Sequence, residues 1–101
     1  MLKSELINAL NEKLPESQSQ DVEAAVNCLL KQMTEALSLG ERIEIRGFGS
    51  FDLRIRPPRI ARNPKTGDTV DLPAITGVHF KPGKDMRDRV DEMRGQCDIS
   101  E

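Results

Sequence analysis

The sequence predicts an α+β fold with two N-terminal helices, an antiparallel sheet with a long protruding β-ribbon arm, and a C-terminal helix. Three observations carry this prediction. Apolar residues recur at helical spacing over the first 40 residues, the period then changes to two, and a helical pattern returns after residue 81. The 101 residues contain no internal repeat and give room for one domain. We expect this domain over 1–94, made of a helical region (1–40), a sheet with its arm (41–80, the arm about 54–76) and a C-terminal helix (81–94), before a polar tail (95–101).

Two amphipathic helices come first. For the first helix, Ser4 is the candidate N-cap and Pro15 ends the run. For the second helix, Ser17 and Gln20 fit a capping box, and Gly40 stands where a C-terminal glycine stop belongs. The apolar faces consist of Leu6, Ile7, Leu10 and Leu14 in the first helix, and Val22, Ala25, Val26, Leu29, Leu30, Met33 and Leu37 in the second.

The period of two begins at Arg42 and predicts a β-hairpin. Ile43 and Ile45 alternate with charged residues, and a second alternating run follows the sequence GFG at 47–49. The glycine spacing matches neither a P-loop nor a dinucleotide-binding fingerprint. We therefore interpret GFG as the turn of the hairpin.

The segment 54–76 is expected to form a ribbon that projects from the body. Turn formers lie at its centre, in NPKTGD at 63–68, but the limb that leads to them has few apolar residues. Pro57 and Pro58 cannot donate to a sheet ladder, and Pro73 on the returning limb suggests a bulge or a kink. A hairpin without an apolar face cannot pack on a core, so it should extend into solvent. Limbs of roughly ten residues would reach ~30 Å at ~3.3 Å per residue.

A strand through Val78 and Phe80 returns to the body, and a last helix follows it. Pro82 and Gly83 mark the start of this helix, and Gly95 marks its end. Its apolar face consists of Met86, Val90 and Met93.

The composition indicates a thin core and excludes several functions. Hydrophobic residues make up 37% of the chain, which excludes wholesale disorder, but there is no Trp, no Tyr and only three Phe. Either aliphatic packing between helices or a partner chain must complete the core. No apolar run approaches the roughly 20 residues of a membrane span, and the N-terminus lacks the layout of a signal peptide. We therefore expect a cytoplasmic protein that does not bind membranes.

Metal binding and catalysis are not expected either. The chain has one histidine, His79, and two distant cysteines, Cys28 and Cys97, which cannot assemble a four-ligand zinc site. We interpret His79 as a packed or surface histidine and Cys28 as a small buried side chain. No catalytic motif is present, so we predict no enzyme activity, no cofactor and no small-molecule substrate.

The charge distribution predicts an anionic partner for one region of the chain. The net charge is -2, yet residues 42–94 hold twelve basic and eight acidic residues. Within 53–67 all the charged residues are basic, and four of the five are Arg, which suits forked contacts with phosphates. The five basic residues are Arg54, Arg56, Arg59, Arg62 and Lys65. An alternative to a nucleic-acid partner is a protein-interaction module whose basic ribbon docks on an acidic protein.

Three motifs resemble the HU/IHF family of bacterial DNA-bending proteins. They are IRGFGSF at 45–51, RNPKTG at 62–67 and FKPGK at 80–84, and the similarity runs from Lys3 to about Val90. The resemblance implies an intertwined dimer, held together by the helical region, with two arms that surround double-stranded DNA in its minor groove and bend it. Within the family, ERIEIRGFGSF and PKTGD are most similar to beta-type subunits of integration host factor. This similarity implies an alpha-type subunit as partner, on the bacterial nucleoid. An HU-like homodimer with little sequence preference is the alternative.

The resemblance also implies which residues contact DNA. Pro64 at the arm tip would intercalate between base pairs, although its alternative role is that of a turn former only. Glu44 would hold Arg46 against DNA and so contribute to sequence preference, whereas an ion pair within the sheet is the alternative for Arg46. Leu2 departs from the pattern, because a hydroxyl residue would suit the start of the first helix. The implied DNA-binding residues are Lys3, Arg46, Gly47, Arg54, Arg56, Arg59, Arg62, Asn63, Pro64, Lys65, Lys81, Lys84 and Arg87.

Overall fold

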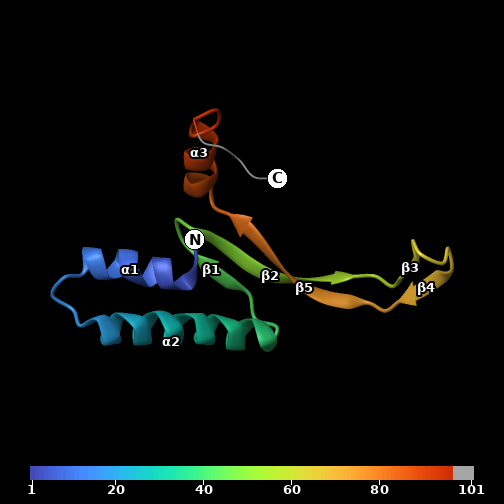
Figure 1. Cartoon of the computed structure of the whole chain (residues 1–101), viewed down its shortest axis with the longest axis horizontal. Coiled ribbons are helices and arrows are strands. Elements are labelled where there is room, and N and C mark those ends of the chain that lie inside the picture. Colours follow the sequence, from blue (N-terminus) through green and yellow to red (C-terminus); the bar gives the residue numbers. More distant parts are fainter. Residues whose placement is uncertain (97–101) are drawn as a thin grey trace.

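The computed structural model describes residues 1–96, in which three helices and five strands form an extended molecule (Figure 1). The predicted α+β class is confirmed. Cys97 and the end of the predicted tail lie outside the described residues. The elements are α1 (Lys3–Lys13), α2 (Ser19–Ser38), β1 (Ile43–Ile45), β2 (Gly49–Arg56), β3 (Arg59–Arg62), β4 (Thr69–Leu72), β5 (Ile75–Pro82) and α3 (Lys84–Glu92).

The predicted N-cap of the first helix is wrong. The N-cap of α1 is Leu2, whose backbone N–H donates to the Glu5 carboxylate at 3.3 Å. In a capping box, the side chain of the third helical residue accepts the backbone N–H of the N-cap residue, and this bond needs no hydroxyl at the N-cap. The contact between Leu2 and Glu5 is this bond. Ser4 therefore lies inside the helix, and the Leu2 side chain makes no hydrogen bond to the first turn.

The start of α2 also differs from the prediction, whereas its end is confirmed. The N–H of Ser17 closes a turn on the Leu14 carbonyl at 3.0 Å, so Ser17 belongs to the connection and Gln18 is the N-cap. At the other end Gly40 has φ +82°, and its N–H bonds to the Leu37 carbonyl. A further bond from Glu41 to the Ala36 carbonyl completes a Schellman motif.

The sheet has the order β1-β2-β5, and both pairs are antiparallel. The predicted hairpin is present, with Gly47 at φ +85° in the turn between β1 and β2. Strand β5 continues to Pro82, past the expected end of the sheet at 80, and α3 begins at Lys84 rather than at 81. Gly83 between them is the N-cap of α3, and its N–H donates to the Phe48 carbonyl at 2.9 Å. This bond ties the start of α3 to the hairpin turn.

A gap interrupts the arm between its root and its tip. The β2–β5 ladder stops at the pair Arg56–Ile75 and the β3–β4 ladder begins at Arg59–Leu72. Both limbs skip the same number of residues, so the register is unchanged and the bulge considered for Pro73 does not form. Proline has no N–H to donate, which explains why the ladder breaks here. The gap residues are Pro57, Pro58, Pro73 and Ala74.

The core of the single chain is thin, as the composition indicated. Among the described residues the buried hydrophobic side chains are Ile7, Val22 and Val26, all on α1 and α2. Leu29 on α2 is 61% exposed and Val90 on α3 is 67% exposed. The radius of gyration is 19.2 Å, against about 13 Å for a compact domain of 100 residues. Cys28 is exposed rather than buried.

Gly49 on β2 and Gly77 on β5 test how closely these two strands approach each other. A Cβ on Gly49 would lie 2.7 Å from the Lys81 carbonyl oxygen and 2.7 Å from the Phe80 ring, whereas a Cβ on Gly77 would meet nothing within 4 Å. Neither glycine has a positive φ. We expect Gly49→Ala to lower the free energy of unfolding by about 1–3 kcal/mol through overpacking. Gly77→Ala should change it by less than about 0.5 kcal/mol. Urea denaturation followed by circular dichroism measures both, and equal effects would contradict the packing described.

Candidate nucleic-acid interface

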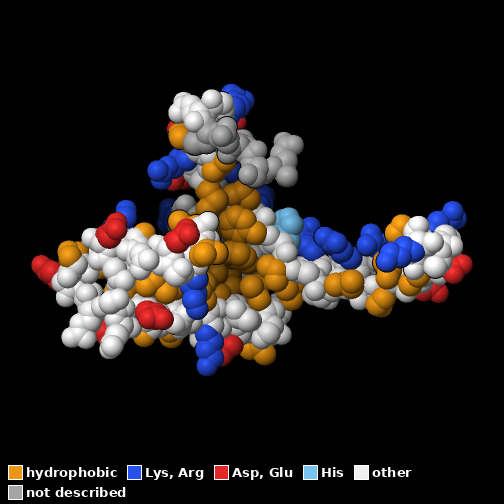
Figure 2. Space-filling model, in the orientation of Figure 1, with side chains coloured by type: hydrophobic (Ala, Val, Ile, Leu, Met, Phe, Trp, Pro, Cys, Tyr) orange, Lys and Arg blue, Asp and Glu red, His pale blue; other side chains and the backbone are white. Residues whose placement is uncertain are grey.

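One face of the β2–β5 ladder is charged and the other is apolar. Because directly opposed residues of an antiparallel pair share a face, Asp52 lies beside His79 and Phe51 beside Phe80. Arg54 and Arg56 follow Asp52 at intervals of two and extend the charged face toward the arm. Figure 2 shows Lys and Arg side chains in a row along one side of the arm and hydrophobic side chains along the other. The arm therefore presents a cationic edge.

The tip of the arm is a tightly bonded turn with an exposed proline. The Asn63 side-chain oxygen accepts the N–H of Lys65 at 2.9 Å, which is an Asx turn around Pro64. The Asn63 carbonyl accepts the Gly67 N–H at 2.7 Å, and Gly67 has φ +76°. The Asn63 N–H donates to the Asp68 carbonyl at 2.8 Å. These bonds hold Pro64 at the outer end of the arm in a fixed conformation.

The predicted cations of the arm do not all share one face. Arg59 and Arg62 are three residues apart on β3, so their side chains leave the ribbon on opposite sides. Both are exposed, as is Lys65 in the tip. The outer section of the arm therefore carries cations on both sides of the ribbon, whereas the cations at its root share one face.

A second cationic site lies where the hairpin turn meets the start of α3. An open hollow of about 610 Å³ is formed there, and we call it the cationic hollow. Among residues 1–96, Glu44 is the one acidic residue that lines it. The turn is held by the bond from the Phe48 N–H to the Ile45 carbonyl at 3.0 Å, and α3 is fixed to the turn through Gly83. The cations that line the hollow are Arg42, Arg46, Lys81, Lys84 and Arg87.

Several predicted site residues have partners within the chain. The Lys3 ammonium donates to the Asn27 side chain at 2.9 Å, and Lys3 does not line the cationic hollow. Lys84 pairs with Asp88 one turn further along α3 at 3.0 Å, a pair of small energetic value because both side chains are exposed. Within residues 1–96 no ion pair joins Glu44 to Arg46, although both line the hollow.

The sequence of this chain is similar to a family of DNA-binding proteins. The family model described as "Bacterial DNA-binding protein" matches residues 1–91. The chain belongs to this family. An integration host factor subunit beta from Alkalilimnicola ehrlichii is 60% identical over 94 residues, which are 93% of this chain and 94% of the relative. The corresponding subunit from Saccharophagus degradans is 58% identical over 92 residues, 91% of this chain and 94% of the relative. The resemblance to the HU/IHF family is thus confirmed.

Solved structures of the bacterial DNA-binding family share the fold. A co-crystal structure of HU with DNA from Anabaena matches with a TM-score of 0.82 and 37% identity, over 89% of this chain and 97% of that chain. An HU variant from Thermotoga maritima matches with a TM-score of 0.64 and 32% identity, over 89% of this chain and 99% of that chain.

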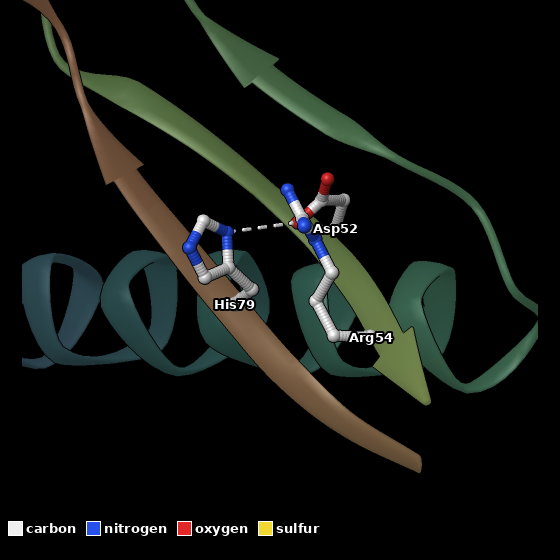
Figure 3. A network of polar contacts seen from close by, with 3 residues as sticks. All are labelled: Asp52, Arg54 and His79. Carbon is white, nitrogen blue, oxygen red and sulfur yellow. Dashed lines mark hydrogen bonds and ion pairs between the residues drawn. The ribbon is translucent and has the colours of Figure 1, made fainter. Parts of the chain in front are cut away.

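Three polar residues at the surface of this bacterial DNA-binding protein were not predicted from the sequence as site residues. Arg42 lines the cationic hollow, and the period of two from Arg42 to Glu44 was the signal for it. Asp52 and His79 form a contact at the root of the arm (Figure 3). The sequence pattern does not predict this contact between residues that are 27 positions apart, because it depends on the register of β2 and β5.

Proposed function

We propose that this chain is the beta-type subunit of an integration host factor, an architectural protein that binds the minor groove of duplex DNA and bends it sharply. It acts in recombination, transcription regulation and nucleoid organisation, on the nucleoid in the cytoplasm, and catalyses no reaction. The observation that carries the proposal is the arm, a ribbon with a cationic edge and a rigid proline at its exposed tip.

The arm tip supplies the bend. Pro64 is apolar, is already fixed in a turn and loses little conformational freedom when it enters a base step. Unstacking costs a few kcal/mol per step. Contacts of Arg59, Arg62 and Lys65 with the groove and its phosphates offset this cost, with Asn63 holding the turn.

The body then binds the flanks of the bent duplex. Smooth bending of a 20–30 base-pair site costs of order 1–6 kcal/mol, and bending brings the flanks toward the protein. We propose that the cationic hollow receives one flank through Arg46, the Gly47 backbone, Lys81, Lys84 and Arg87, with Arg42 as a further contact. Lys3 near the start of α1, and Arg54 and Arg56 at the root of the arm, add phosphate contacts.

The chain functions as a dimer in this proposal. The exposed apolar faces of α2, β5 and α3 need a second chain to cover them, and the helical region over residues 1–40 contributes to this interface. The 53–60% identity to integration host factor beta subunits favours an alpha-type subunit as the partner. An HU-like homodimer is the second candidate, since HU structures share the fold.

Glu44 and Arg46 are proposed to give the sequence preference. Both line the cationic hollow, and an acid beside DNA is costly unless it orients a base-contacting arginine. We expect Glu44→Ala to lower the discrimination between a preferred and an unrelated duplex by roughly tenfold, which is about one base pair of specificity. Glu41→Ala is the control, because it removes the same charge and Glu41 does not line the hollow. Competition gel shifts measure the ratio, and equal effects of the two variants would contradict the assignment.

A competition gel shift tests the proposed function. The purified chain, alone and mixed with an alpha-type subunit, is titrated into ~35-base-pair duplexes in a salt series, with protein measured by peptide-bond absorbance because Trp and Tyr are absent. Tight, bent and sequence-selective complexes only with the partner support the heterodimer. Equal binding by the lone chain to all sequences supports the HU-like homodimer. Absence of duplex binding in both preparations would overturn the proposal in favour of an acidic protein partner. The affinity should fall linearly with salt in a log–log plot.

A further inference from the structure

A carboxylate, an imidazole and a guanidinium meet at the root of the arm. Asp52 on β2 and His79 on β5 are directly opposed, and the His79 Nδ1 lies 3.2 Å from the Asp52 Oδ1. The Arg54 Nε lies 3.6 Å from the same oxygen. Figure 3 shows the His79 ring and the Arg54 guanidinium both close to the Asp52 carboxylate. The His79 side chain is 45% exposed and the Arg54 side chain 64% exposed, so both reach the surface.

The contact fixes how the imidazole ring uses its two nitrogens. A carboxylate only accepts hydrogen bonds, so Nδ1 of His79 carries a proton and donates it to Asp52. The other nitrogen, Nε2, has no partner within residues 1–96. In the neutral ring Nε2 is an acceptor, which cannot bond to another acceptor such as a phosphate oxygen. In the protonated ring Nε2 is a donor, and the ring can bond to Asp52 and to a phosphate together.

Four charged side chains lie on the same face as the ring. They are Asp52 and Arg54 on β2, with Arg56 further along it, and Lys81 two residues from His79 on β5. A phosphate on this face would add negative charge and favour protonation of the ring.

We propose that His79 is a DNA-phosphate contact, positioned by Asp52, whose protonation tightens DNA binding as the pH falls from 8 to 6. The inference rests on the proposed function, because it needs duplex DNA on the charged face of the β2–β5 ladder. DNA binding is then accompanied by proton uptake at His79, and Asp52 is a positioning residue that presents the ring to the phosphate.

Affinity against pH, with and without His79, tests the inference. His79 is the one histidine among the 101 residues, and histidine is the side chain that ordinarily changes charge in this range. Uptake of one proton raises the affinity by at most tenfold per pH unit. Between pH 8.0 and 6.0 we expect the affinity of the unmodified protein for a ~35-base-pair duplex to rise about 3- to 10-fold more than that of His79→Gln. Fluorescence anisotropy at constant ionic strength measures both, in the assembly that binds DNA, under reducing conditions.

Two further variants separate charge from structure. His79→Lys keeps a positive charge at both pH values, so it should bind at pH 8.0 about as tightly as the unmodified protein at pH 6.0. Asp52→Asn keeps an acceptor for Nδ1 but removes the charge that favours the protonated ring. It should reduce the pH dependence while the protein still binds DNA. A purely structural role of the pair would change the affinity of these variants equally at all pH values.

The outcomes distinguish this inference from the proposed function. If the unmodified protein and His79→Gln bind DNA with the same pH dependence, the His79 inference is overturned and the proposed function stands. If neither binds duplex DNA at either pH, both are overturned. A pH dependence that disappears in His79→Gln and in His79→Lys supports the inference.

Discussion

Replacing Pro64 with alanine is expected to remove most of the DNA bend while leaving the protein folded. Pro64 lies in an exposed turn that is held by the Asn63 side chain, and it contributes nothing to the buried core. Alanine has neither the rigid ring nor the apolar surface that would hold two base pairs apart. On the proposed function, the flanks would not reach the cationic hollow without the kink. We expect the affinity to fall roughly tenfold to hundredfold through the loss of these wrapping contacts.

Energy transfer between dyes at the two ends of a ~35-base-pair duplex measures the bend directly. Pro73→Ala is the matched control, because it makes the same chemical change in the gap near the root of the arm, away from the tip. The control should retain the bend and the affinity. Full energy transfer with Pro64→Ala, or an equal loss with Pro73→Ala, would contradict intercalation at the tip.

The main elements of the fold follow from local rules. Gly40 ends α2 and Gly47 forms the hairpin turn, because each position has a positive φ that favours glycine. The caps were harder to predict, since a cap depends on where the chain enters the helix. Glu5 bonds to the backbone of Leu2, and Ser17 is used by the connection that follows α1. Such choices between neighbouring polar residues differ little in energy and are not fixed by periodicity.

The candidate site could be predicted only where its residues are contiguous. The turn NPKTGD and the cations beside it lie in one stretch, and the structure places them at the arm tip as expected. The cationic hollow and the contact between Asp52 and His79 instead join separate strands. A slip of one residue in the β2–β5 register would place these two side chains on opposite faces. In the observed register Phe51 is opposite Phe80 on the apolar face, and the sequence pattern does not specify this pairing.

The aromatic cluster is expected to carry the largest share of the stability. The ring centroids of Phe51 and Phe80 are 4.7 Å apart, and those of Phe48 and Phe80 are 5.5 Å apart. Phe80 thus contacts both other phenylalanines, yet it is 36% exposed in the single chain, so a partner chain would complete its burial. Phe80→Ala should lower the free energy of unfolding by about 3–5 kcal/mol. A domain has only about 5–15 kcal/mol in total, so this loss is a large fraction of the stability and should lower the urea midpoint strongly.

Urea denaturation at two protein concentrations separates packing from assembly. If the cluster is completed by a partner chain, the midpoint of the unmodified protein should rise with protein concentration, because association stabilises the folded state by mass action. Ile55→Ala is the control, since Ile55 lies on the same face of β2 but is 73% exposed toward the arm. It should cost less than about 1 kcal/mol. A midpoint independent of concentration would show that the single chain folds alone. The exposed faces of α2 and α3 would then need another explanation than dimerisation.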